Sequence, residues 1–94
     1  MLVELVQLKK LGDKYSLSTV YVNPRQIIYM SEDTRMRQDL QEGKLNIGLN
    51  QNFTAFTRIR MNMPGYVEEI TVVGDPGLIE SKIFSKTSKQ LLRG

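Results

Sequence analysis

The fold is decided by the stretch FTAFTRIRMNMPGYVEEITVV, residues 53–73. Residues 53–61 and 66–73 are rich in β-branched, aromatic and aliphatic side chains, and the sequence NMPG separates the two runs. An adjacent proline and glycine are a strong turn signal. The stretch therefore predicts an antiparallel β-hairpin, whose alternating side chains divide into two faces.

One face of the predicted hairpin is expected to be the core, whereas the other face is mixed. The expected core face comprises Phe53, Ala55, Thr57, Ile59, Met61, Tyr66, Ile70 and Val72. The mixed face comprises Thr54, Phe56, Arg58, Arg60, Val67, Glu69, Thr71 and Val73.

The mixed face contains the first candidate site, which is formed by Phe56, Arg58, Arg60 and Glu69. An aromatic ring beside two guanidinium groups can stack on a nucleobase and hold phosphate, which suggests nucleic-acid binding. The alternative is a solvated face on which Arg58 or Arg60 forms a cross-strand salt bridge with Glu69. A subunit contact is the third interpretation, because apolar side chains of this face would otherwise be exposed.

The hairpin leads into VVGDPGLIESK, residues 72–82, which predicts the start of a helix over roughly 75–86. Asp75 is a preferred N-cap and Pro76 is a preferred first helical residue. Ile79 and Ile83 are four residues apart, so they share one side of that helix. The glycine spacing does not match a phosphate-binding motif, so we expect a structural helix start here and not an anion site.

The end of the chain is basic. Residues 82–94 carry four basic side chains and no acidic one, whereas the first 81 residues carry nine basic and ten acidic side chains. The four fall at helical spacing: Lys82, Lys86, Lys89 and Arg93. They can form a solvated helix end, a basic helix for an acidic partner or nucleic acid, or a docking segment for another subunit. We expect a single domain over 1–86 and a basic tail over 87–94.

The segment SEDTRMRQDLQEG precedes the hairpin and predicts a short polar helix. Ser31 or Asp33 can cap this helix, and Gly43 can end it. Met36 and Leu40 would form its apolar side.

The remaining residues before the hairpin predict strands and a loop. The strands are expected at 2–10, 15–22 and 26–30. The sequence KLNIGLNQN at 44–52 predicts either an ordered loop packed by Leu45, Ile47 and Leu49 or a mobile lid. The whole pattern predicts an α+β fold, with a small bent antiparallel sheet of about five strands, a C-terminal helix and a short inserted helix.

The composition excludes several common catalytic chemistries. The 94 residues include no cysteine and no histidine, so thiolate and imidazole chemistry and zinc sites built on these ligands are absent. Glu68 and Glu69 are consecutive in a predicted strand and would point to opposite faces. We therefore expect a non-enzymatic protein with no catalytic residues, no metal and no cofactor.

The sequence also bears on location. No apolar run approaches the ~20 residues of a membrane-spanning helix. The N-terminal MLVELVQLKK has its acidic residue before its lysines, which is the reverse of a signal peptide. We expect a cytoplasmic protein without membrane contact, located in the host cytoplasm if the chain is viral.

The order of these segments resembles the small flagellar-regulator family typified by FlbD. The likeness rests on MLVELVQL, YVNPRQIIYM and TVVGDPGLIESKI. It implies strands followed by a short basic helix, and this chain adds about twenty residues, roughly 32–52, before the fourth strand. The pattern is also similar to small accessory proteins of tailed bacteriophages, which are often inhibitors or sponges of host systems. Neither resemblance implies catalytic residues.

Three functions are compatible with these observations. The first is a regulatory or inhibitory binding module, bacterial or phage, that acts through protein–protein contacts as a homo-oligomer. The second is a nucleic-acid-binding regulator that uses Arg58, Arg60 and the basic tail. The third is a small-ligand (nucleotide) binder at a subunit interface that is closed by the 44–52 loop.

Overall fold

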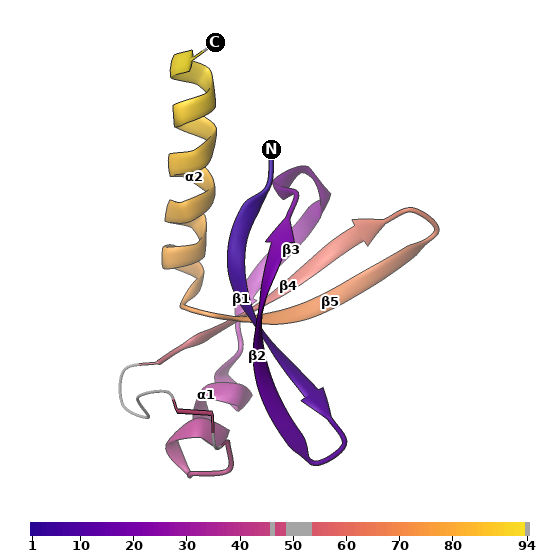
Figure 1. Ribbon diagram of the computed structural model, residues 1–94, viewed down its shortest axis with the longest axis vertical. Coiled ribbons are helices and arrows are strands. Elements are labelled where there is room, and N and C mark those ends of the chain that lie inside the picture. Colours follow the sequence, from indigo (N-terminus) through magenta and orange to yellow (C-terminus); the bar gives the residue numbers. More distant parts are fainter. Residues whose placement is uncertain (46, 49–53, 94) are drawn as a thin grey trace.

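The computed structural model describes residues 1–45, 47–48 and 54–93, and for residues 86–93 it describes the helical backbone. These residues have the predicted α+β fold and form five strands, two α-helices and one 3₁₀ turn, labelled η1 (Figure 1). The elements are β1 (Val3–Leu11), β2 (Lys14–Val22), η1 (Pro24–Gln26), β3 (Ile27–Glu32), α1 (Thr34–Gln41), β4 (Phe56–Met63), β5 (Tyr66–Val73) and α2 (Pro76–Arg93).

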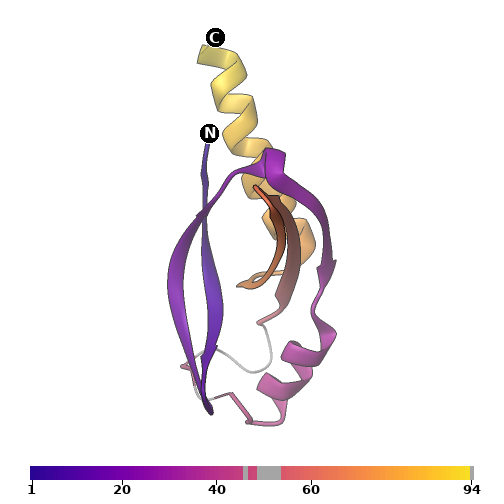
Figure 2. The ribbon, with the colours of Figure 1, turned by 90° about the vertical axis from the view of Figure 1, so that its right-hand side faces the viewer.

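The five strands form one antiparallel sheet in the order β2-β1-β5-β4-β3. The two edge strands, β2 and β3, are consecutive in the chain, and only residues 23–26 connect them. Because so short a connection cannot cross a flat five-stranded sheet, the sheet must bend until its edges approach each other at this end. Figure 2 shows this curvature, with η1 joining β2 on one side to β3 on the other.

The predicted hairpin is formed by β4 and β5. Their register ends at the pair Met63 and Tyr66, which leaves Pro64 and Gly65 as a two-residue loop. Gly65 has a φ of 81°, a conformation that suits glycine after proline in a type II turn. The hairpin and its turn are therefore confirmed, but its first strand begins at Phe56 and not at residue 53. Thr54 and Ala55 lie outside the strand, and Phe53 lies outside the described residues.

The concave side of the bent sheet, called the inner face here, holds the main core. Its buried residues come from β1, β2, β4 and β5, together with one residue of α2. They are Val3, Leu5, Val22, Ile59, Met61, Ile70, Val72 and Ile79. The predicted core face of the hairpin is thus confirmed for Ile59, Met61, Ile70 and Val72, whereas Tyr66, at 57% exposure, is not part of the core. Thr57 is also fully buried, and its Oγ1 donates a 2.7 Å hydrogen bond to the carbonyl oxygen of Gly74.

A second apolar cluster lies on the opposite side of the sheet, called the outer face. It consists of Leu8, Leu40, Leu45 and Phe56, with Met36 and Ile47 packed against it. Phe56 is 0% exposed, so the expectation that its ring is available to a partner was wrong. The physical reason is that α1 and the segment after it cover this end of the outer face, and the polar helix supplies the few apolar residues needed to do so.

The inserted helix α1 begins at Thr34, after the second of its two predicted caps. Asp33, and not Ser31, caps it: its Oδ1 accepts a 3.1 Å hydrogen bond from the amide of Met36. Ser31 belongs to β3. Leu45 is buried and Ile47 is half-buried, as an ordered loop requires. Leu49 and the rest of the suggested lid, 49–52, lie outside the described residues.

The C-terminal helix α2 begins where the sequence predicted but is longer. The Oδ1 of Asp75 accepts a 2.7 Å hydrogen bond from the amide of Leu78, which confirms the N-cap. Gly74 has a φ of 115°, and a Cβ placed there would lie 3.0 Å from Leu78 Cδ2. The helix continues past the predicted end at residue 86 to Arg93, so the backbone of the basic tail is part of α2.

Candidate functional site

The outer face carries an exposed group of residues beyond the part that α1 covers. Arg60 of β4 lies between Tyr29 of β3 and Glu69 of β5 in the register of the sheet. Arg58 occupies the same central position between Ser31 and Thr71. We call the exposed group the arginine face, which comprises Tyr29, Arg58, Arg60, Val67 and Glu69.

Two arginines of this face share one carboxylate. Arg58 Nη1 lies 3.7 Å from Glu69 Oε1, and Arg60 Nη1 lies 4.0 Å from Glu69 Oε2. The predicted cross-strand salt bridge is therefore confirmed, and it involves both arginines. Because the three side chains are about 40–45% exposed, each pair contributes ~0–1 kcal/mol to stability. The pairs orient the guanidinium groups and leave the trio with one uncompensated positive charge.

Tyr29 is the residue of this face that sequence reasoning missed. Ile27 pairs with Met61, so strict alternation would place Tyr29 on the inner face as well. An irregularity between Ile27 and Tyr29 shifts the register by one residue, and Tyr29 instead pairs with Arg60. Its side chain is 46% exposed on the outer face. The irregularity thus places the accessible ring of Tyr29 on the outer face, where the predicted aromatic residue, Phe56, is buried.

A polar cleft of about 330 Å³ separates the arginine face from α1. Its lining consists of Lys10, Tyr15, Asp33, Arg35, Met36, Asp39, Arg58, Glu69 and Thr71. Three of these side chains are basic and three are acidic, so the cleft has no net charge. The buried Asp33 is already engaged, since its Oδ2 accepts a 3.2 Å hydrogen bond from Thr71 Oγ1 while its Oδ1 caps α1. The geometry fits a structural joint between α1 and the sheet.

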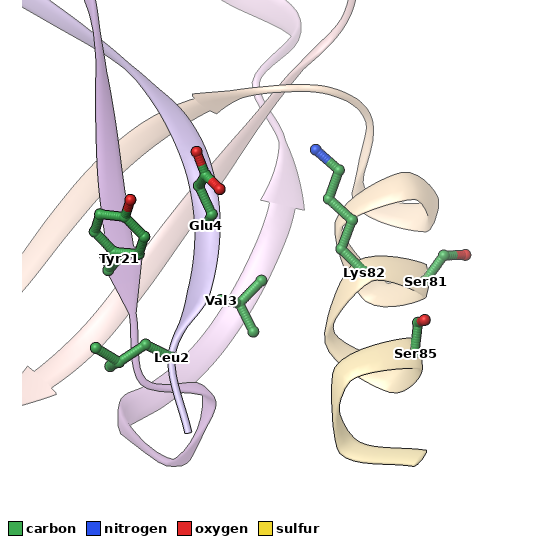
Figure 3. Close-up of a pocket in the computed structure, with 7 residues that line it drawn as sticks. All are labelled: Leu2, Val3, Glu4, Tyr21, Ser81, Lys82 and Ser85. Atoms are coloured by element: carbon green, nitrogen blue, oxygen red, sulfur yellow. The ribbon is translucent and has the colours of Figure 1, made fainter. Parts of the chain in front are cut away.

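The basic residues of α2 belong to another part of the molecule. Lys82 lines a cavity of about 450 Å³ between α2 and the start of the sheet, together with Leu2, Val3, Glu4, Tyr21, Ser81 and Ser85. In Figure 3 the Lys82 side chain extends toward β1, whereas the Ser81 hydroxyl points away from the strands. The side chains of Lys86, Lys89 and Arg93 lie outside the described part. Lys82 and Arg58 line different cavities, so the two candidate sites are not brought together.

The start of α2 is built as a helix cap. The amide of Leu78, which an anion would need, donates to Asp75 Oδ1 instead. In the described ranges, no three acidic side chains gather closely enough to hold a metal ion. No helix in those ranges has the length and apolarity to cross a membrane.

Comparisons with known proteins add no relative. Neither the family models, nor the curated proteins, nor the solved structures gave a match to this chain. Function must therefore be argued from the surfaces of the molecule itself.

Proposed function

We propose that the chain is a non-enzymatic regulatory or inhibitory binding module, bacterial or phage, which acts through protein–protein contacts as a homo-oligomer. The observation that supports this function best is the arginine face. There, Tyr29 and Val67, at 46% and 48% exposure, flank two arginines that one shared glutamate holds. Tyrosine and arginine are enriched at protein interfaces and among the residues that dominate binding energy.

The charge of the arginine face indicates the kind of partner. Glu69 compensates one of the two arginines, so the trio carries one net positive charge. A partner that offers a carboxylate beside an aromatic or aliphatic group would complement it. The sequence supports a non-enzymatic role, because it has neither cysteine nor histidine to act as nucleophile or base.

Capture of a partner from bacterial lysate tests the arginine face. We expect a protein held by the immobilised chain to be lost from the variant Tyr29→Ser/Arg60→Ser. The matched control is Tyr66→Ser/Arg25→Ser, which removes one exposed tyrosine and one exposed arginine elsewhere. Equal capture by both variants would contradict the proposal. Light scattering tests the oligomer, and a monomer at high micromolar concentration would refute that part.

A nucleic-acid-binding regulator is the second candidate, because Tyr29 lies beside Arg60 on an open sheet face. Bases can stack on such a ring while guanidinium groups hold the phosphates. In this case Arg58→Ala/Arg60→Ala and deletion of 86–94 would weaken binding of single-stranded oligonucleotides. They would also reduce the dependence of affinity on salt concentration. An unchanged affinity and salt slope would exclude this candidate.

A further inference from the structure

In its described part, the long C-terminal helix packs against the sheet through the side that carries Ile79 and Ile83. Ile79 is 0% exposed in the main core, and Ile83 is half-buried beside it. A helix of 18 residues is about 27 Å long. Figure 1 shows α2 running past the N-terminus and the turn η1 that precedes β3, so that its second half extends beyond the sheet. The side chains that pack α2 against the sheet in its described part therefore come from its first turns, and much of the circumference there is open to a partner.

The side of α2 that faces away from the sheet carries two exposed apolar side chains in its described part. Leu78 is 48% exposed and Phe84 is 71% exposed, and they lie three residues before and after Ser81. Helical spacing therefore places Ser81 midway between the two apolar side chains. In Figure 3 the Ser81 hydroxyl points away from the strands, while Ser81 and Ser85 also line the cavity beside α2. We call these four residues, Leu78, Ser81, Phe84 and Ser85, the outward side of α2.

The outward side is bordered by opposite charges. Glu80 and Lys82 are two positions apart, which places them about 200° apart around a helix, at the two edges of this side. Neither forms an ion pair with another described side chain. If two copies of α2 pack in parallel through this side, the Glu80 edge of one helix lies beside the Lys82 edge of the other. In an antiparallel pair, Glu80 of one helix would lie on the same edge as Glu80 of the other, and Lys82 on the same edge as Lys82, so like charges would be together.

We propose that a second copy of this chain occupies the outward side, so that α2 pairs in parallel with its symmetry mate. The small Ser81 and Ser85 let the two helices approach, while Leu78 and Phe84 supply apolar contact on each side of them. The contact is isologous, because one patch serves both copies. The inference rests on the homo-oligomer of the proposed function and assigns its interface, leaving the arginine face free for a different protein.

Sedimentation of the full chain over a range of concentrations tests this interface. One pair of helices buries less area than the ~1,600 Å² of a standard interface, so we expect a dimer that dissociates in the micromolar range. Phe84→Glu should raise the dissociation constant at least about tenfold, because the substitution occurs twice in a symmetric dimer. Leu11→Glu is the matched control, since Leu11 is equally exposed at 72% but belongs to β1. It should leave the dissociation constant unchanged.

Charge reversal and cross-linking test the parallel orientation. Glu80→Lys and Lys82→Glu should each weaken the dimer, and the double reversal should restore it. The chain has no cysteine, so Ser81→Cys introduces a unique thiol. In the parallel pair the two Ser81 positions face each other, and mild oxidation should link them. Ser16→Cys, an exposed position on β2, should remain unlinked.

The possible results separate this inference from the proposed function. A strict monomer at high micromolar concentration would overturn both the homo-oligomer and its interface. A dimer that Phe84→Glu leaves intact would overturn only the α2 interface. A dimer that Phe84→Glu dissociates, but that the double charge reversal fails to restore, would overturn the parallel arrangement. Circular dichroism of each variant shows whether the fold is retained.

Discussion

The two ends of the outer face behave differently although they share the same strands. At one end Phe56 is completely buried beneath α1 and Leu45. Two and four residues further along β4, Arg58 and Arg60 stand open to solvent beside Glu69. Alternation along a strand decides which face a side chain occupies, but a separate element decides whether that face is covered. One end of the face therefore supports the fold and the other is available for binding.

The largest loss of stability is expected when the buried ring of Phe56 is removed from the covered end. Phe56→Ala should lower the free energy of unfolding by about 3–5 kcal/mol, because it leaves a cavity between the sheet and α1. Urea unfolding measures the change. Phe56→Leu, which keeps most of the volume, should lose about 1.5 kcal/mol or less. If Phe56→Ala unfolds at the wild-type midpoint, the ring is not the centre of this second core.

The joint between α1 and the sheet should give the next largest effect. Asp33→Ala removes the N-cap of α1, worth ~0.5–2 kcal/mol, and also leaves the Thr71 hydroxyl without its acceptor. We expect a total loss of about 1–3 kcal/mol in urea unfolding. Asp33→Asn is the control, because an asparagine oxygen can accept in the capping position and should lose less. Equal stability of the alanine variant and the wild type would show that α1 is held by Leu40 and Met36 alone.

The turns and helix caps could be predicted from the sequence, but which end of the outer face is covered could not. The turn residues Pro64 and Gly65 and the cap Asp75 act through local backbone preferences, and these were visible in the sequence. The burial of Phe56 depends on Leu40 and Leu45, which approach it only after the chain folds back across the sheet. Met36 and Leu40 indicated an apolar side of this helix, but no local signal indicated which part of the sheet it would cover.

The accessible aromatic of the candidate site was hidden for a different reason. In QIIYM the alternation of side chains places Tyr29 on the same face as Ile27. The register irregularity between these residues reverses that assignment, and it depends on how β3 meets β4 rather than on a local signal. The salt bridge to Glu69 could be predicted, because it follows from the register of a two-residue hairpin loop.

A smaller effect is expected at the open end. Arg58→Ala and Arg60→Ala should each change the free energy of unfolding by less than about 1 kcal/mol, since their shared ion pair with Glu69 is exposed. Arg60→Ala should nevertheless reduce partner capture, because the open end is proposed to bind. Unfolding and capture are measured on the same preparations. A loss of stability as large as that of Phe56→Ala would mean that this end, too, is structural.

The smallest effect is expected at the exposed rim of the covered end, where Glu42 ends α1. The hydrogen bond from Lys44, at 2.9 Å, and a second one from Gln38 lower the pKa of Glu42 below its ordinary value of 4.5. A carboxyl whose pKa is lowered by folding stabilises the folded state above its unfolded pKa, and that contribution disappears as the pH falls through the folded pKa.

Lys44→Ala should therefore raise the pKa of Glu42 toward 4.5 in an NMR titration, and Gln38→Ala should raise it less. The unfolding midpoint at neutral pH should hardly move, because both side chains are exposed and solvent screens their attraction. A pKa that stays low without Lys44 would mean that this rim is held by other contacts, and the boundary between the covered and the open end would then have to be drawn elsewhere.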